Sequence, residues 1–401
     1  MRSPTALRLS AAYAATGLSG GVYIPFFGAW LAYKGLSAAE IGTLLSAGML
    51  LRVIVPPLTG MIADARDDRR GVMIWLFGLQ FAGYLALNWA VGPLEIFVVA
   101  VTANVASNAA TPLQESVSMR LAERFGFDYG RVRMWNSMVY AASNVVSGLA
   151  IARFGMIVLA PWLAVSLALA FVSICFLPAP PRDHPHGALH VRLRATFAEA
   201  RELMASAPFL LFLCAASLDQ GSHAFYYGYG GLHWLRLGYS GALIGAIWPL
   251  GVVAEAMLFS VSLRLFRGIG ATRLLLLGGV GCVVRWTILA FDPPFALVVI
   301  AQILHGATFA LAHLGAMYFI LKAVPPRLSA TAQSLYAVGS NGVAMGLATY
   351  ASGLLYPAYG GRTYFLMAAM GAGAVLFAWG LGRAWDGGRI TQRSDEAMEA
   401  I

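Results

Sequence analysis

Twelve long apolar runs occupy most of this sequence and leave few architectures open to it. A helix crosses the hydrocarbon core of a membrane with about 20 mostly apolar residues. Of the 401 residues, 59% are hydrophobic and only 11% are charged, so a water-soluble fold would lack the polar surface to cover itself. We therefore predict an all-α integral membrane protein with twelve transmembrane helices, at residues 7–33, 39–62, 72–91, 94–119, 134–152, 156–177, 208–235, 241–263, 274–291, 295–321, 331–356 and 363–382.

One long polar segment separates these runs into two groups of six. It covers residues 178–207, begins rich in proline and histidine, and ends with a predicted short amphipathic helix on the membrane surface. The predicted organisation is an N-terminal six-helix bundle at 1–177, a cytoplasmic linker at 178–207, a C-terminal six-helix bundle at 208–385 and a cytoplasmic tail at 386–401.

The basic residues predict the orientation of the helices. With both termini in the cytoplasm, 21 of the 27 Lys and Arg residues lie in cytoplasmic segments, 4 lie outside and 2 lie within the membrane. This is a strong positive-inside bias. The basic residues form no continuous face and do not alternate with aromatic residues, so the net charge of +9 does not indicate a nucleic-acid partner.

Two segments of similar sequence, 203 residues apart, indicate an internal repeat. Residues 35–42 read GLSAAEIG and residues 238–245 read GYSGALIG. In both copies a charged residue follows ten positions later, Arg52 in the first and Glu255 in the second. Short glycine-rich matches arise by chance in apolar sequence, but a charge in each predicted span favours a true repeat. Parallel repeats relate the two halves of major facilitator transporters, which bind substrate near the repeat interface.

Several titratable side chains lie inside predicted spans, where a charge costs at least ~2.5–3.5 kcal/mol. Burial brings carboxyl and imidazole groups into a range in which they exchange protons near neutral pH. For His305 alone, a hydrogen bond between helices is the simpler interpretation. As a set, however, the following residues are candidates for proton coupling: Asp219, Glu255, Arg285 and His305.

A polar stripe runs down the predicted helix 94–119, with side chains spaced i, i+4, i+7 and i+11. Its members are Asn104, Asn108, Thr111 and Glu115. Such a stripe either joins helices or lines water. A short loop between antiparallel neighbours would bring Glu115 to Arg133, either as a structural ion pair or as a ligand site.

The loop after the second predicted span contains closely spaced glycine, acid and arginine residues. The acid is predicted to cap or pair across helices, and Gly60 is predicted to permit close helix contact. An ordinary positive-inside loop is the alternative. The residues are Gly60, Asp64, Arg69 and Arg70.

These residues give the chain a resemblance to the lactose-permease branch of the major facilitator superfamily, and more closely to its phenylpropionic acid transporters. The loop resembles the G-x-x-x-D-x-x-x-R-R signature of the superfamily, with some drift in spacing. The densest matches are DYGRVRMW at 128–135, GSHAFYYG at 221–228, LGVVAE at 250–255, VVRW at 283–286 and QILH at 302–305.

The resemblance implies a role for each matching residue. Glu115 and Arg133 match a carboxylate–guanidinium pair that binds substrate, whereas Glu255, Arg285 and His305 match the proton-coupling set. Asp219 matches an acid of the seventh helix. One departure concerns the position three residues after His305, where the sugar permease has its proton-carrying carboxylate and this chain has Thr308. Proton release would then use Glu255 or Asp219.

The predicted function is uptake of a small aromatic carboxylate, such as 3-phenylpropionate, by proton-coupled symport across the inner (plasma) membrane. A sugar, an oligosaccharide or a nucleoside is the alternative substrate. The proton is the only coupling partner expected, with no cofactor, no metal and no enzymatic activity, and the chain is expected to work as a monomer in the bilayer. The candidate substrate-binding residues are Tyr23, Arg52, Glu115, Arg133, His223, Tyr226 and Tyr227.

Overall fold

The computed structural model describes residues 3–180 and 189–390, and these residues contain helices and no strand. The predicted tail at 386–401 therefore lies largely outside the described residues, as do residues 181–188 of the linker. The chain divides into two compact units. The first comprises the described part of residues 1–187 together with Tyr226–Pro249, and the second comprises the remainder.

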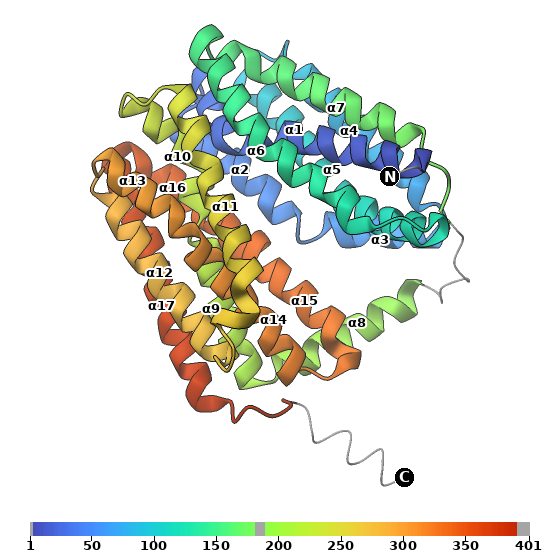
Figure 1. The fold of residues 1–401 in the computed structure, drawn as a ribbon, viewed down its shortest axis with the longest axis vertical. Coiled ribbons are helices and arrows are strands. Elements are labelled where there is room, and N and C mark those ends of the chain that lie inside the picture. The colour runs from blue at the N-terminus through green and yellow to red at the C-terminus, as the bar shows by residue number, and fades with distance from the viewer. Residues whose placement is uncertain (1–2, 181–188, 391–401) are drawn as a thin grey trace. The chain divides into compact units, whose positions relative to one another are not determined.

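The first unit combines the helices that begin the chain with one later segment. They are α1 (Pro4–Tyr33), α2 (Ala38–Leu51), α3 (Val55–Ala65), α4 (Arg69–Ala86), α5 (Pro93–Phe125), α6 (Tyr129–Phe154) and α7 (Leu159–Cys175), with α10 (Ala224–Arg236) and the start of α11 (Gly241–Leu265). Helix α1 packs on α6 and α7, and α4 packs on α5 and α7 (Figure 1). An apolar core between these helices includes Leu9, Phe77, Leu121 and Ile174.

The second unit contains most of the remaining helices. They are α8 (Leu189–Met204), α9 (Ala207–Gly221), the rest of α11, α12 (Ala271–Ala290), α13 (Phe295–Ile303), α14 (Ala312–Ala323), α15 (Ser329–Ala337), α16 (Met345–Tyr359) and α17 (Tyr364–Ala384), with π-helical turns η2 (Gly306–Leu311) and η4 (Val338–Ala344). The Arg327 guanidinium, two residues before α15 begins, donates two hydrogen bonds to the Glu202 carboxylate of α8, at 2.6 and 3.0 Å.

Each of the twelve predicted spans contains helix, but several are interrupted. Seven described segments are long and apolar enough to cross a membrane, or eight if the sharply bent pair Arg194–Met204 and Ala207–Arg236 counts as one span. The number twelve therefore stays a prediction. The second span breaks at Arg52–Ile54, between α2 and α3, where Pro56 and Pro57 follow and cannot donate backbone hydrogen bonds.

The internal repeat has the same local backbone in both copies. Gly35 and Gly238 adopt φ values of +90° and +89°, which favour glycine. Leu36 N donates to Leu31 O at 3.1 Å, and the equivalent Tyr239 N donates to Trp234 O at 2.9 Å. In each copy the serine two residues after the glycine caps the next helix. The repeated sequence thus encodes a repeated helix–turn–helix.

Glycines allow α10 to pack closely on α1 within the first unit. A Cβ at Gly28 in α1 would overlap the carbonyl oxygen of Gly228, and a Cβ at Gly231 would overlap that of Pro25. Tyr229 Oη donates to the carbonyl of Ala38 at 2.7 Å. Backbone-to-backbone contact at this range leaves no room for side chains, so small residues are required on both helices.

We expect Gly28→Ala to destabilise the first unit by about 1–3 kcal/mol, because the new methyl group forces α10 away from α1. Thermal unfolding of the purified protein in detergent measures this change. Gly60→Ala is the matched control, since a Cβ at Gly60 would meet no atom within 4 Å. A Gly28→Ala protein as stable as the control would contradict the prediction.

Candidate functional site

The first unit contains a partly open cavity of about 360 Å³ among α1, α4, α5, α6 and α7, with Arg52 at its edge. Helix α4 contributes one face, with Phe77, Gln80 and Tyr84 spaced i, i+3 and i+7. The remaining lining residues are Tyr13, Thr16, Ser19, Gly20, Tyr23, Ile24, Arg52, Asn104, Ser107, Asn108, Thr111, Gln114, Glu115, Arg133, Asn136, Leu163 and Leu167. Four of the seven predicted substrate-binding residues thus lie around one space.

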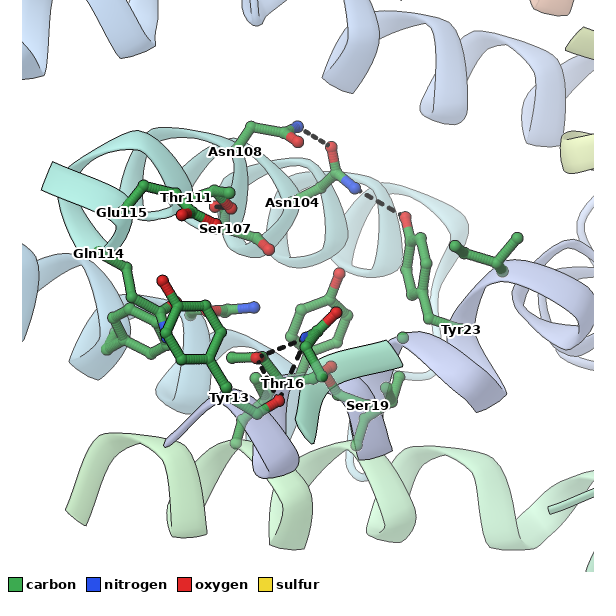
Figure 2. Close-up of a pocket in the computed structure, with 18 of the residues that line it drawn as sticks. Tyr13, Thr16, Ser19, Tyr23, Asn104, Ser107, Asn108, Thr111, Gln114 and Glu115 are labelled. Atoms are coloured by element: carbon green, nitrogen blue, oxygen red, sulfur yellow. Dashed lines mark hydrogen bonds between the residues drawn. The ribbon is translucent and has the colours of Figure 1, made fainter. Parts of the chain in front are cut away.

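The polar stripe on α5 lines this cavity, which agrees with the interpretation that it lines water and not only joins helices. Asn108 Nδ2 donates to Asn104 Oδ1 at 2.8 Å, and Asn104 Nδ2 donates to Tyr23 Oη at 2.8 Å (Figure 2). Arg52 Nη2 donates to Asn108 Oδ1. Because an arginine can only donate, it orients both amides, and the whole chain of hydrogen bonds runs from Arg52 to Tyr23.

Arg52 brings a positive charge to the cavity without a matching acid. It follows the last residue of α2, where the helix dipole favours a cation and the break before α3 lets the side chain turn. Arg52 is exposed at the surface of the cavity. Among residues 3–180 and 189–390, no carboxylate lies within ion-pair distance of it, and its hydrogen-bond partner is the amide of Asn108. An anionic ligand group would supply the missing charge.

Glu115 and Arg133 meet as predicted. The Nε atom of Arg133 donates to Oε1 of Glu115 at 3.0 Å. The turn that brings them together begins at Gly126, whose φ of +64° ends α5, and continues to Asp128, whose carboxylate caps α6. The charges of Glu115 and Arg133 cancel. The three charged residues that line the cavity therefore carry a net charge of +1, which comes from Arg52.

The second unit contains a separate cluster of buried polar groups around Arg285. Its Nη1 donates to His305 Nδ1 at 2.8 Å and to Thr308 Oγ1 at 3.2 Å, and its Nη2 donates to Gln302 Oε1 at 3.2 Å. His223 Nε2 lies 3.2 Å from the same Thr308 hydroxyl. Gln302, the first residue of the QILH segment, is therefore part of this cluster.

Arg285 also fixes which nitrogen of His305 carries the proton. Because the guanidinium donates to Nδ1, that nitrogen is the acceptor, and the ring proton of the neutral imidazole lies on Nε2. This Nε2 lies 3.8 Å from Oε2 of Glu255. The imidazole of His305 thus lies between the guanidinium of Arg285, to which it is hydrogen-bonded, and the carboxylate of Glu255, which is beyond hydrogen-bond distance.

Not every predicted residue lies at these two sites. His223 contacts Thr308 in the second unit and does not line the cavity, so its contact with substrate stays a prediction. Tyr226 stacks on Trp248, with ring centroids 4.4 Å apart, and neither Tyr226 nor Tyr227 lines the cavity. Asp219 is only 1% exposed, and its Oδ2 accepts from Cys282 Sγ at 3.6 Å, apart from Glu255 and His305.

The predicted loop of glycine, acid and arginines is ordered by ion pairing. Asp64 Oδ1 lies 2.7 Å from Arg69 Nη2, and Arg69 Nη1 donates to Ser116 Oγ on α5 at 2.6 Å. Arg70 donates to the carbonyls of Cys175 and Leu177 at the end of α7. The close helix contact predicted at Gly60 is wrong, because a side chain at this position would meet open space.

The sequence did not identify two cavity glutamines. Gln80 and Gln114 are 6% and 4% exposed, and both line the cavity. The available signal was weak: Gln80 is a polar residue in an apolar span, and Gln114 directly precedes Glu115. Neither lies on the i, i+4, i+7, i+11 stripe that drew attention to α5.

A multi-pass helical membrane protein with a polar, ring-lined cavity inside one bundle has the construction of a solute transporter. The chain belongs to the MFS_1 like family, whose model matches residues 8–367. It is a transporter and not an enzyme.

Similar proteins agree with this assignment. The chain is 28% identical to the probable 3-phenylpropionic acid transporter of Escherichia coli (strain K12), over 89% of this chain and 92% of that protein. It is 29% identical to the maltose permease of Geobacillus stearothermophilus, over 84% of each. The crystal structure of the nucleoside transporter NupG superposes with a TM-score of 0.78 at 17% identity, over 96% of this chain and all of that one. The last comparison establishes the fold alone.

Proposed function

We propose that this protein is a proton-coupled symporter that takes up a small aromatic carboxylate, such as 3-phenylpropionate, by alternating access. The observation that carries the proposal is Arg52, a guanidinium at the cavity with no carboxylate partner among the described residues. In a low-dielectric site, an anion binds best to a fixed cation with directed donors.

The cavity also suits the apolar part of such a ligand. Tyr23 packs edge-on against Tyr84 at 6.0 Å between ring centroids, and both rings line the cavity together with Phe77. Aromatic rings prefer this edge-to-face or offset geometry with one another, so they provide a surface for one more ring. The probable 3-phenylpropionic acid transporter is also the relative with the most extensive alignment described above.

The buried cluster around Arg285 supports coupling to protons. Thr308 removes the carboxylate that would follow His305 in the sugar permease, and its hydroxyl instead accepts from Arg285. Glu255 is then the acid that faces His305, at 23% side-chain exposure. We assign proton binding and release to Glu255, with His305 and Arg285 positioning it. We further propose an inner-membrane monomer with both termini cytoplasmic and the Asp64–Arg69 loop as its cytoplasmic gate.

Uptake of labelled 3-phenylpropionate into proteoliposomes tests the proposal directly. We expect accumulation with an inward proton gradient and only slow equilibration without one. Equal uptake under both conditions would remove the symport assignment. An absence of binding and uptake would remove the assignment of the substrate.

A sugar or a nucleoside is the second candidate substrate. The Glu115–Arg133 pair and the asparagines of the cavity can bind several hydroxyl groups. Maltose permease and NupG carry solutes of this kind by name. The uncompensated charge on Arg52 favours the anionic substrate, and competition between labelled 3-phenylpropionate and unlabelled maltose or nucleosides distinguishes the two.

A further inference from the structure

Five primary amides line the cavity of the first unit, and they divide into two kinds. Asn104 and Asn108 are joined to each other and to Tyr23, and Asn136 Nδ2 donates to Tyr13 O and Thr16 Oγ1 at 3.1 and 3.0 Å. Gln80 and Gln114 have no hydrogen bond to any described residue. Three of the five cavity amides are therefore hydrogen-bonded to other described residues, and two are not.

Both of these glutamines are largely buried in the wall of the cavity. Gln80 is 6% exposed and Gln114 is 4% exposed, and Nε2 of Gln114 is buried without a partner among the described residues. Buried polar groups in folded proteins are hydrogen-bonded in the great majority of cases. Two unbonded amides on adjacent helices, α4 and α5, at one cavity indicate a site for a polar ligand group.

Gln114 lies further along α5 than the part of the cavity that contains Arg52. It follows Asn108, the partner of Arg52, by six residues on α5, which at 1.5 Å per residue is a rise of about 9 Å. Figure 2 shows Gln114 and Asn104 towards opposite ends of this helix. A ligand whose carboxylate binds Arg52 would direct its far end, beyond the ring, towards Gln114.

The chemistry of this end favours a neutral hydroxyl group. An amide offers both donors and an acceptor, which a hydroxyl group complements with its own donor and lone pairs, whereas a carboxylate can only accept. Arg133, the other cation of the cavity, is paired with Glu115, so among the described lining residues no uncompensated cation besides Arg52 is left to balance a second anionic group. An unsubstituted ring would leave both amides without partners.

We infer that Gln80 and Gln114 form a neutral subsite for a hydroxyl group, so that the preferred substrate is a ring-hydroxylated aromatic carboxylate. The inference rests on the proposed function, because it takes the Arg52 guanidinium as the binding site of the carboxylate. It makes the two glutamines specificity-determining residues. A site built to hydrogen-bond a hydroxyl group discriminates strongly against the analogue that lacks it.

Matched ligands test the inference on the full-length protein in detergent. Dissociation constants for 3-phenylpropionate and for its 3- and 4-hydroxyphenyl analogues are measured by titration calorimetry. We expect one hydroxylated acid to bind at least about tenfold more tightly than the parent acid. Gln80→Met and Gln114→Met, which keep an unbranched side chain, should each reduce this preference, measured as the ratio of the two dissociation constants within one variant.

Gln333→Met is the matched control, because Gln333 lies exposed on α15 and outside the cavity; it should retain the full preference. Equal binding of all three acids by the unmodified protein would overturn the inference and leave the proposed function intact. A preference that survives in both cavity variants would also overturn it. Binding of none of the acids would overturn the proposed function and this inference with it. If a variant fails to fold, the dissociation constants of the three acids for the unmodified protein still test the inference.

Discussion

Arg52→Gln is expected to weaken the binding of 3-phenylpropionate by about 10- to 150-fold, the factor that corresponds to loss of a charge-assisted hydrogen bond worth about 1.5–3 kcal/mol. Glutamine can still donate to Asn108, so the chain of hydrogen bonds to Tyr23 keeps its first member. The substitution therefore removes the charge with little change to the cavity wall. The dissociation constant of the purified variant measures the effect.

Arg131→Gln provides the control for this experiment. Arg131 lies two residues before Arg133 on α6, is largely exposed and pairs only loosely with Asp128, at 3.5 Å. It does not line the cavity, so its loss should leave the affinity unchanged. If Arg52→Gln bound the acid as tightly as the control, the carboxylate would not bind at Arg52.

Glu255→Gln is expected to reduce gradient-driven accumulation of substrate to the level of empty liposomes while exchange of substrate across the membrane continues. Glutamine fills the same space and keeps a polar side chain facing His305 Nε2, but it cannot bind or release a proton. In the proposed mechanism, net symport requires the carboxyl group of Glu255 to lose its proton in each cycle, whereas exchange does not. Accumulation and counterflow in proteoliposomes measure the two processes separately.

Asp219→Asn is the comparison that distinguishes the two candidate acids. Asp219 is 1% exposed and contacts Cys282, and in the described part of the chain no cation lies within ion-pair distance of it. We expect this variant to accumulate substrate. Loss of accumulation in Asp219→Asn, with normal accumulation in Glu255→Gln, would transfer the coupling role to Asp219.

Local sequence patterns were sufficient to predict the helices and one part of the site. The spacing of Asn104, Asn108 and Glu115 placed them on one face of α5, and the short loop after Glu115 placed Arg133 beside it. Both inferences depend only on helix geometry and on chain connectivity. The break after Arg52 also had a sequence signal, the two prolines that follow it. The uninterrupted apolar run nevertheless led to the prediction of one continuous helix.

Contacts between segments far apart in the sequence were not predictable in the same way. Thr308 lies in the π-helical turn η2, and its hydroxyl meets both Arg285 and His223, which are 23 and 85 residues away. The sequence grouped His223 with Tyr226 and Tyr227 as candidate substrate-binding residues, on the expectation that they share a face of one helix. In the structure its imidazole belongs to the second unit, whereas those tyrosines belong to the first.

The sequence by itself determined that this protein is a bundle of membrane helices with charged residues inside it. Each helix satisfies its own backbone hydrogen bonds, so an apolar run of sufficient length specifies a span without reference to the rest of the chain. Only the tertiary structure decided that, among the described residues, Arg52 lacks an acid and Gln80 and Gln114 lack partners. Those facts depend on how each helix is rotated against its neighbours, which is set by packing between distant segments and by no local pattern.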